Sequence, residues 1–167
     1  MNSAPGIHVR AYAPQDAAAV NRIAVAAYAQ YRETFTDWQT AGPRFSATSD
    51  HAKVLELLVA EEGDAIRGFV GYVAPGRPRE RIFKRPWAVM RMLAVDPPAR
   101  GRGIGRRLIE ECIAHARRDA APIIGLHTSP VMAAALSLYL RLGFVHHKDV
   151  VDRHGIQYAV YTLDLGG

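Results

Sequence analysis

The chain of 167 residues is 49% hydrophobic and carries a formal net charge of +5, because 21 Lys and Arg oppose 16 Asp and Glu. This length and composition predict one folded domain over residues 1–167 and exclude an intrinsically disordered chain. The single cysteine, Cys112, excludes an intramolecular disulfide framework and a multi-cysteine zinc site, and it favours a reducing compartment. The sequence has no run of about 18 apolar residues and no secretory signal pattern, so we expect a cytoplasmic protein without a membrane partner.

The positive charge is concentrated in one window. Residues 76–107 hold nine arginines and one lysine against two acidic residues, a net charge of +8, whereas the other 135 residues carry a net charge of −3. A local basic patch indicates an anionic partner. Composition alone leaves nucleic acid, an anionic membrane surface and a phosphorylated small molecule open.

The first half of the chain combines helical and extended patterns. Four aromatic residues at spacings of three and four are expected along one helical stripe that ends at Gly42-Pro43. They are Tyr28, Tyr31, Phe35 and Trp38. The expected elements are a strand over 7–12, helices over 14–29 and 49–55, a hairpin of 57–62 with 66–73, a basic loop over 75–86 and a strand over 87–95.

The second half predicts a strand, helix, strand unit with a right-handed crossover. An amphipathic helix to Arg118 repeats apolar residues every fourth position, and Ser129-Pro130 is expected to cap a further helix that stops at Gly143. The expected elements are a helix over 104–118, a strand over 123–127, a helix over 131–142 and a hairpin of 144–151 with 157–165. These patterns predict one α+β domain with a central mixed sheet.

A glycine-rich loop separates the strand ending at Val95 from the helix that follows it. Gly101, Gly103 and Gly105 leave backbone N–H groups at a helix N-terminus, where the helix dipole favours an anion such as a pyrophosphate. The loop lacks G-x-x-x-x-G-K-[ST], which excludes a P-loop. Arg106 stands where a dinucleotide fingerprint needs its third glycine, which weakens that assignment.

Two motifs resemble the signatures of the GCN5-related N-acetyltransferase (GNAT) family. The signature R/Q-x-x-G-x-G/A falls on Arg100, Gly103 and Gly105, and the later signature L-Y-x-x-x-G-F falls on Leu138 to Phe144. The order of the expected elements also resembles the family over essentially the whole chain. The resemblance implies α/β/α layers, with a mixed, mostly antiparallel sheet of about seven strands and about four helices.

The resemblance implies direct transfer of an acetyl group from acetyl-CoA to a primary amine of a small molecule or peptide. It places the arm of the co-substrate between the strands that end at Val95 and His127, with the pantetheine on backbone groups of Leu93 and Val95. The cofactor-binding residues that it implies are Leu93, Ala94, Val95, Arg100, Gly101, Arg102, Gly103, Ile104, Gly105 and Arg106. It also allows a homodimer.

The catalytic candidates follow from the same resemblance. Tyr139 matches the tyrosine that protonates the departing thiolate, although packing in the core would also explain its position. Many relatives place a glutamate on the strand where this chain has only Arg91, so His127 and Glu33 are the candidates for the general base, with structural or solvated roles as the alternative. Met132 stands where the family often has an asparagine that contacts the cofactor or a water molecule.

Thr128 or Ser129 is a candidate to replace that contact. Tyr31, Phe35 and Trp38 are expected to wall the acceptor site or to pack in the core. The basic loop is expected either to be a solvated surface loop or to form a lip that attracts an acidic acceptor or the 3′-phosphate of CoA.

No metal is expected, because His146, His147 and His154 lack metal-ligand spacing. No nucleic-acid partner is expected, because phosphates at a helix N-terminus explain the arginines of the glycine loop. The alternative function is a non-catalytic acyl-CoA-binding or sensing module, which the missing glutamate and Met132 favour.

Overall fold

A computed structural model describes residues 6–153 and 155–166, with helices and strands in the order that the sequence predicts. Among these residues no helix has the length and hydropathy needed to cross a membrane. The strands are β1 (Ile7–Ala11), β2 (Glu56–Glu62), β3 (Ala65–Val73), β4 (Ala88–Val95), β5 (Ile123–Thr128), β6 (Val145–Arg153) and β7 (Ile156–Asp164). The helices are α1 (Ala17–Tyr28), α2 (Trp38–Phe45), α3 (Ile104–Arg118) and α4 (Ala133–Arg141).

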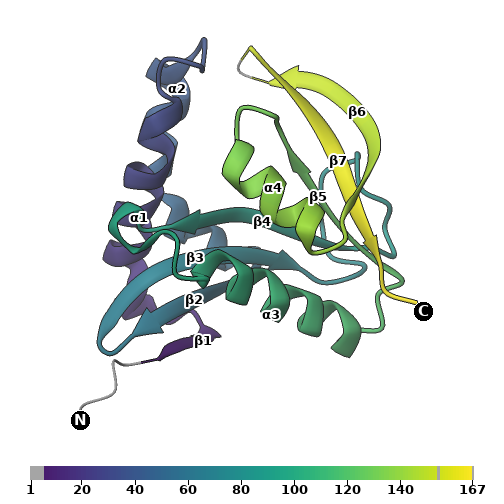
Figure 1. Cartoon of the computed structure of the whole chain (residues 1–167), viewed down its shortest axis with the longest axis horizontal. Coiled ribbons are helices and arrows are strands. Elements are labelled where there is room, and N and C mark those ends of the chain that lie inside the picture. The colour runs from purple at the N-terminus through teal and green to yellow at the C-terminus, as the bar shows by residue number, and fades with distance from the viewer. Residues whose placement is uncertain (1–5, 154, 167) are drawn as a thin grey trace.

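The seven strands form one sheet in the order β1-β2-β3-β4-β5-β7-β6 (Figure 1). Neighbouring strands are antiparallel, except that β4 and β5 run parallel. A parallel pair needs a crossover connection, which α3 provides. The predicted mixed, mostly antiparallel sheet is therefore confirmed.

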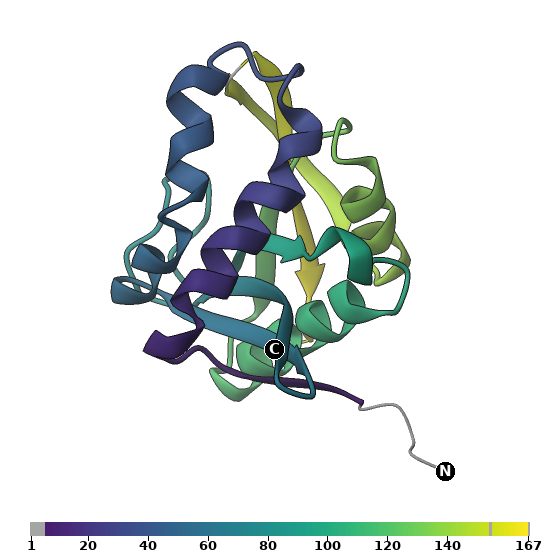
Figure 2. The same cartoon turned by 90° about the vertical axis from the view of Figure 1, so that its left-hand side faces the viewer.

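Helices cover both faces of the sheet. Figure 2 shows α1 and α3 on opposite sides of the strands, and the apolar side chains of the two helices belong to separate buried clusters. The α3 cluster contains the predicted stripe of Ile104, Leu108, Cys112 and Ala116. Burial raises the pKa of the Cys112 thiol, so this cysteine is a core residue, as the α3 pattern predicts. The α/β/α layering that the resemblance implies is present.

The aromatic stripe differs from its prediction, because no single helix carries it. Helix α1 ends at Tyr28, a 3₁₀ turn follows over Ala29–Tyr31, and Trp38 begins the separate helix α2. Gly42-Pro43 was expected to end the stripe but lies inside α2. A Cβ at Gly42 would lie 2.9 Å from the Trp38 ring, so glycine here allows the indole to lie against its own helix.

Two helix boundaries also differ from their predictions. The helix expected over 49–55 is a 3₁₀ helix over Thr48–Lys53. Helix α4 begins at Ala133 with Met132 as its N-cap, although the Val131 N–H does donate to the Ser129 hydroxyl at 3.4 Å. Gly143 ends α4 with a φ of +98°, as predicted.

Candidate active site

The parallel strands β4 and β5 pair only at their first residues and then separate. The register joins Ala88 to Ile124 and Val89 to Gly125, and no later residue of β4 pairs with β5. The β5-facing edge of Met90–Val95 therefore has free backbone groups. A cavity of about 610 Å³ opens at this point, and β4, β5, α3, α4 and the end of α1 all contribute to its lining.

A bulge in β4 turns the strand inside this cavity. Met92 has a φ of +60°, and the register with β3 shifts between Phe69 and Gly71. Positive φ at a non-glycine residue stores strain that recurs at functional sites. Beyond the bulge, the Leu93 carbonyl accepts a long hydrogen bond of 3.5 Å from the Tyr28 hydroxyl, and Leu93, Ala94 and Val95 line the cavity.

The glycine loop forms one wall of the cavity. Gly101 and Gly103 have φ values of +78° and +80°, and a Cβ at either residue would meet no atom within 4 Å. Glycine is therefore needed there for its conformation, and the space above the loop is open. Gly103 is the N-cap of α3, where the first helical bond runs from the Arg107 N–H to the Gly103 carbonyl at 3.1 Å. The N–H groups of residues 104–106 precede that bond and are available to an anion.

The arginines around this loop are less free than the sequence suggests. Arg102 makes a two-bond ion pair with Glu62 of β2, both bonds 2.9 Å long, and Arg106 bonds Glu110 at 2.8 Å. Arg100 is exposed and reaches the Ala27 carbonyl at 3.5 Å. The backbone N–H groups are therefore the main uncommitted donors of the loop. Within the described residues, the side chain of Arg107 has no ion pair or hydrogen bond.

Tyr139 lies on α4 in the wall of the same cavity and is 6% exposed. Its ring packs against Phe144, with ring centroids 5.9 Å apart. Burial raises the pKa of Tyr139 above its ordinary value, so the hydroxyl is protonated at neutral pH. The sequence left a packing role and an active-site position as alternatives for Tyr139. In the structure the residue both packs against Phe144 and lines the cavity.

The β5 end of the cavity brings His127, Thr128 and Met132 together. Thr128 is 3% exposed and its hydroxyl donates to the Met132 sulfur at 3.8 Å. Thr128 and Met132 line the cavity, whereas Ser129 does not. His127 also lines the cavity, and its ring lies between those of Phe83 and Tyr158 at 5.9 and 5.4 Å.

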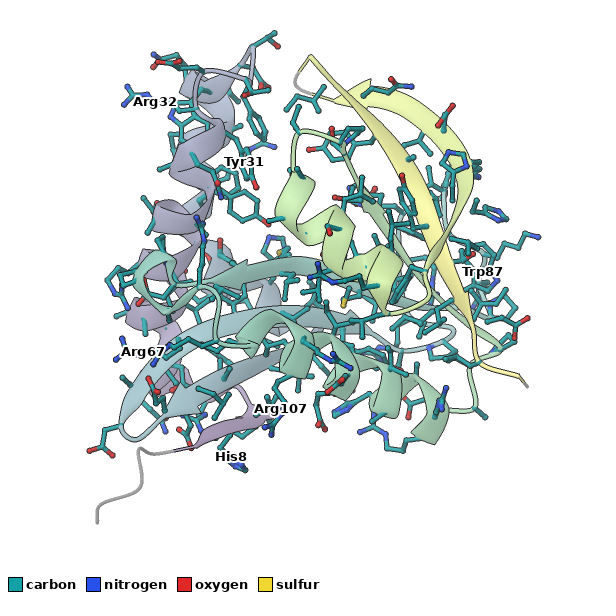
Figure 3. The ribbon with its side chains drawn as sticks, viewed as in Figure 1. His8, Tyr31, Arg32, Arg67, Trp87 and Arg107 are labelled. Carbon is teal, nitrogen blue, oxygen red and sulfur yellow. The ribbon has the colours of Figure 1, made fainter. Side chains whose placement is uncertain are left out.

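Four other predicted site residues lie in different places. Tyr31 lines the cavity from the side of α1 that faces α4, as Figure 3 shows. Phe35 and Trp38 pack beyond that lining, in a cluster with Ile156 of β7. Glu33 is exposed and does not line the cavity.

The segment that joins α1 to α2 contacts the turn between β6 and β7. Thr36 touches Gly155 of the β6–β7 turn so closely that a Cβ there would collide with it. The contact brings together two segments that are far apart in the sequence.

Tyr28 lines the cavity but was not among the residues predicted for the site. Its position on α1, four residues after the buried Ala24, indicated that its ring points inward.

The basic loop lies away from this cavity. It precedes the first residue of β4, whereas the glycine loop follows the last, and eight strand residues separate the two ends by about 25 Å. Figure 3 shows Trp87, at the end of the loop, on the opposite side of the molecule from Tyr31. None of residues 76–87 lines the cavity. The predicted lip for the 3′-phosphate of CoA therefore lies outside this cavity.

Metal-ligating side chains do not gather in the described part of the chain. Over residues 6–153 and 155–166, no group of three His, Cys, Asp or Glu side chains is arranged to hold a metal ion. His146 instead bonds Asp149 at 2.8 Å, and the His147 ring packs against Trp87. His154 lies outside the described residues.

Comparison with solved structures supports the fold. The crystal structure of a GNAT family acetyltransferase from Brucella melitensis in complex with acetyl-CoA is 26% identical, with a TM-score of 0.64 over 97% of this chain and 90% of that chain. The ribosomal-protein-S18-alanine N-acetyltransferase from Escherichia coli is 18% identical, with a TM-score of 0.70 over 96% and 94% of the two chains. That second likeness concerns the fold alone.

Curated relatives match over part of their own length. A mycothiol acetyltransferase of Cellulomonas flavigena is 30% identical over 148 residues, which is 84% of this chain and 41% of that protein. An uncharacterized N-acetyltransferase of Methanocaldococcus jannaschii is 40% identical over 70 residues, which is 42% of this chain and 30% of that protein. The chain thus spans less than half the length of these relatives.

The sequence profile of the acetyltransferase (GNAT) family matches residues 17–144. This range runs from the first residue of α1 to the end of the second signature motif, and it contains both walls of the cavity. The chain therefore belongs to the GNAT family of acetyltransferase enzymes.

Proposed function

We propose that residues 1–167 act as one domain that transfers an acetyl group from acetyl-CoA directly to a primary amine of a small molecule or peptide. The observation that carries the proposal is the cavity between the separated strands β4 and β5, with a glycine loop at one wall and the Tyr139 side chain at another. The family match and the acetyl-CoA complex of the Brucella melitensis relative support it.

The residues present fit acetyl-CoA. The open space above Gly101 and Gly103, together with the N–H groups of residues 104–106, suits a pyrophosphate. The free edge of β4 beyond Val89 offers backbone groups of Leu93 and Val95 to an amide-bearing arm, as an added strand would use them. Ala94, Arg100, Ile104 and Arg106 also line the cavity, whereas Arg102 of the same loop pairs with Glu62.

Acetyl-CoA, when bound, supplies the acetyl thioester. The chain's own residues orient the two reactants, exclude water and donate a proton. In this proposal Tyr139 is the acid, because its buried side chain lines the cavity and its protonated hydroxyl is able to neutralise the departing sulfur. Backbone N–H groups of β4 near the Met92 bulge polarise the thioester carbonyl.

His127 is the better of the two candidates for the general base, because it lines the cavity and Glu33 does not. An unperturbed imidazole titrates near pH 6.5. If His127 accepts the proton, His127→Ala removes the rise in kcat/KM with pH that the wild type shows, measured with a fixed amine. A pH–rate profile that keeps this rise would exclude His127 and favour a water relay.

The acceptor site lies on the α1 side of the cavity, where Tyr31 and Tyr28 contribute rings. Phe35 and Trp38 shape that side from behind by packing against the β6–β7 hairpin. An aromatic wall accommodates the apolar part of an amine and can also attract a cation.

The test is a screen of primary amines with detection of the released CoA thiol. We expect release above the hydrolytic background for at least one class among aminoglycosides, polyamines, amino acids and peptide N-termini. Tight acetyl-CoA binding without thiol release for any class would favour the acyl-CoA-binding module, for which the Met132 contact with Thr128 is the structural argument.

A further inference from the structure

In the structure the predicted basic loop belongs to the segment that connects β3 to β4, residues 74–87. This segment, called the basic loop below, has a positive charge that acetyl-CoA does not explain. Its arginines lie at the opposite end of β4 from the glycine loop, and none of them lines the large cavity. An inference about this loop is independent of the proposed acetyl transfer.

Arg79 holds the loop in one shape. Its guanidinium donates to the carbonyls of Ala74 at 2.6 Å and Arg77 at 2.9 Å, and also to those of Lys84 and Trp87. Burial lowers the pKa of Arg79, and the nearby positive charge of Arg85 lowers it further. The loop is thus built around an inward-facing cation.

Two aromatic rings fix the loop to the core. Phe83 and Trp87 are each 4% exposed and belong to one buried cluster with Val89 and Val160. Their backbone N–H groups close turns onto Glu80 and Lys84, both at 3.1 Å. Lys84 and Arg85 therefore lie between two anchored rings.

A second cavity, of about 330 Å³, lies within the loop, and Arg77, Arg79, Arg81 and Arg85 all line it. Arg77, Arg81 and Arg85 are exposed, and within the described residues their side chains have no ion pair or hydrogen bond. Glu80 also lines the cavity, but its carboxylate pairs with Arg91 at 3.3 Å. Four guanidinium groups thus share one cavity whose single carboxylate is already paired with a cation.

This arrangement differs from that of three other arginines. Arg10, Arg102 and Arg118 each bond a carboxylate at 2.9 Å or less. The charge in the loop is instead concentrated, since Arg77, Arg79, Arg81 and Arg85 line one cavity.

We propose that this cavity binds a phosphomonoester group. The planar fork of an arginine matches phosphate oxygens with two parallel hydrogen bonds, and several forks can bond one phosphate at once. A phosphomonoester carries close to two negative charges at pH 7, so it balances this cluster better than a single carboxylate does.

The test uses the whole chain saturated with CoA, so that the glycine loop is occupied, and inorganic phosphate as the probe. Arginine Nε–H resonances are followed by NMR during the titration, at an ionic strength held constant with chloride. We expect saturable shifts for the loop arginines and a phosphate Kd at least tenfold weaker in the double variant Arg81→Ala/Arg85→Ala. Both residues are exposed, so the variant is expected to fold.

The matched control is Arg117→Ala, which removes an exposed arginine of α3 that does not line the loop cavity. It is expected to leave the phosphate Kd unchanged, and all variants are expected to keep the wild-type KM for acetyl-CoA within about twofold. Equal shifts with phosphate and with chloride, or an unchanged Kd in the double variant, would overturn the proposal.

Two further ligands identify the source of the phosphate. Tighter binding of a phosphoserine peptide than of glycerol 3-phosphate assigns the site to a phosphorylated protein, and the reverse order assigns it to a small metabolite. A peptide with glutamate in place of phosphoserine is expected to bind at least tenfold more weakly. Equal binding of the two peptides would replace the proposed phosphate site with a general acidic-segment site.

Discussion

Tyr139 joins packing and chemistry in one side chain. Its ring belongs to the main buried cluster, and the residue also lines the cavity between β4 and β5. Removing only the oxygen separates the two roles, because phenylalanine keeps the contact with Phe144. We expect Tyr139→Phe to lower kcat by roughly 10² to 10⁴ while leaving the KM for acetyl-CoA within about twofold.

The measurement is steady-state kinetics with saturating amine. Tyr161→Phe is the matched control, since Tyr161 is a partly buried tyrosine of β7 that does not line the cavity. It is expected to keep the wild-type kcat. A normal kcat in Tyr139→Phe would leave Tyr139 with the packing role alone.

Gly103 illustrates a requirement set by the backbone. Its φ of +80° would strain any side chain, although a Cβ there has open space around it. We expect Gly103→Ala to lower the free energy of unfolding by about 1 to 2 kcal/mol and to weaken acetyl-CoA binding, because relief of the strain displaces the N–H groups of the loop. Urea unfolding without ligand measures the first effect.

Gly6→Ala is the control for that measurement, because Gly6 has neither a positive φ nor a neighbour within 4 Å of a Cβ. Its free energy of unfolding is expected to stay within about 0.5 kcal/mol of wild type. Equal stability of the two variants would argue that the loop relaxes without cost.

At the scale of elements, Asp16 ties the start of α1 to β1. Its carboxylate accepts bonds of 2.7 and 2.9 Å from Arg10 and one of 2.8 Å from the Ala13 N–H, and Arg10 also bonds Glu61 of β2. The Arg10 bonds hold the pKa of Asp16 below its ordinary value, although burial opposes them. A lowered folded pKa contributes stability above the unfolded pKa, and this contribution is lost as the pH falls through the folded pKa.

We therefore expect Asp16→Asn to lower the free energy of unfolding by about 1.5 to 3 kcal/mol at pH 7. The difference from wild type is expected to shrink once the pH falls below about 4, the ordinary pKa of an aspartate. Urea unfolding between pH 7 and 3 measures it, with Asp50→Asn as the control for an exposed pair. A difference that stays constant down to pH 3 would contradict the assignment to Asp16.

Elements with one strong periodic signal could be predicted from the sequence, and those set by tertiary contacts could not. Helix α3 has apolar residues at every fourth position, so its range is predicted correctly. Gly42-Pro43 is a helix-breaking pair by local rules, yet it lies inside α2, because the first turn is already held by Asp37 carbonyl bonds to the N–H groups of Thr40 and Ala41. Neither those bonds nor the packing of Trp38 on Gly42 leaves a recognisable pattern in the sequence.

The candidate site divides in the same way. The glycine loop, Tyr139 and His127 could be placed at one cavity, since two motifs and a strand end mark them. The pairing of Arg102 with Glu62 could not be predicted from the sequence. The two residues are 40 positions apart, and only the order of the strands in the sheet brings β2 near the loop. The exposure of Glu33 likewise depends on how the chain turns between α1 and α2, which local sequence leaves undetermined.

At the scale of the molecule, the sheet consists of two parts joined by two residue pairs of β4 and β5. A ligand between β4 and β5 contacts both parts and therefore stabilises the whole fold. We expect saturating acetyl-CoA, at about 100 times its Kd, to raise the free energy of unfolding by about 2.7 kcal/mol. Locally, hydrogen exchange is expected to slow most at the amides of residues 93–95 and 101–106, which the ligand covers.

Amides of β1 at the sheet edge are the internal control, because they exchange by local opening that the ligand does not reach. ATP and NAD at the same concentration are the ligand controls, since neither has a pantetheine arm to pair with the free edge of β4. If ATP protects residues 93–95 as strongly as acetyl-CoA does, the cavity recognises phosphates alone and the edge of β4 plays no part in binding. Protection limited to residues 101–106 would lead to the same conclusion, since only the pyrophosphate would then be held.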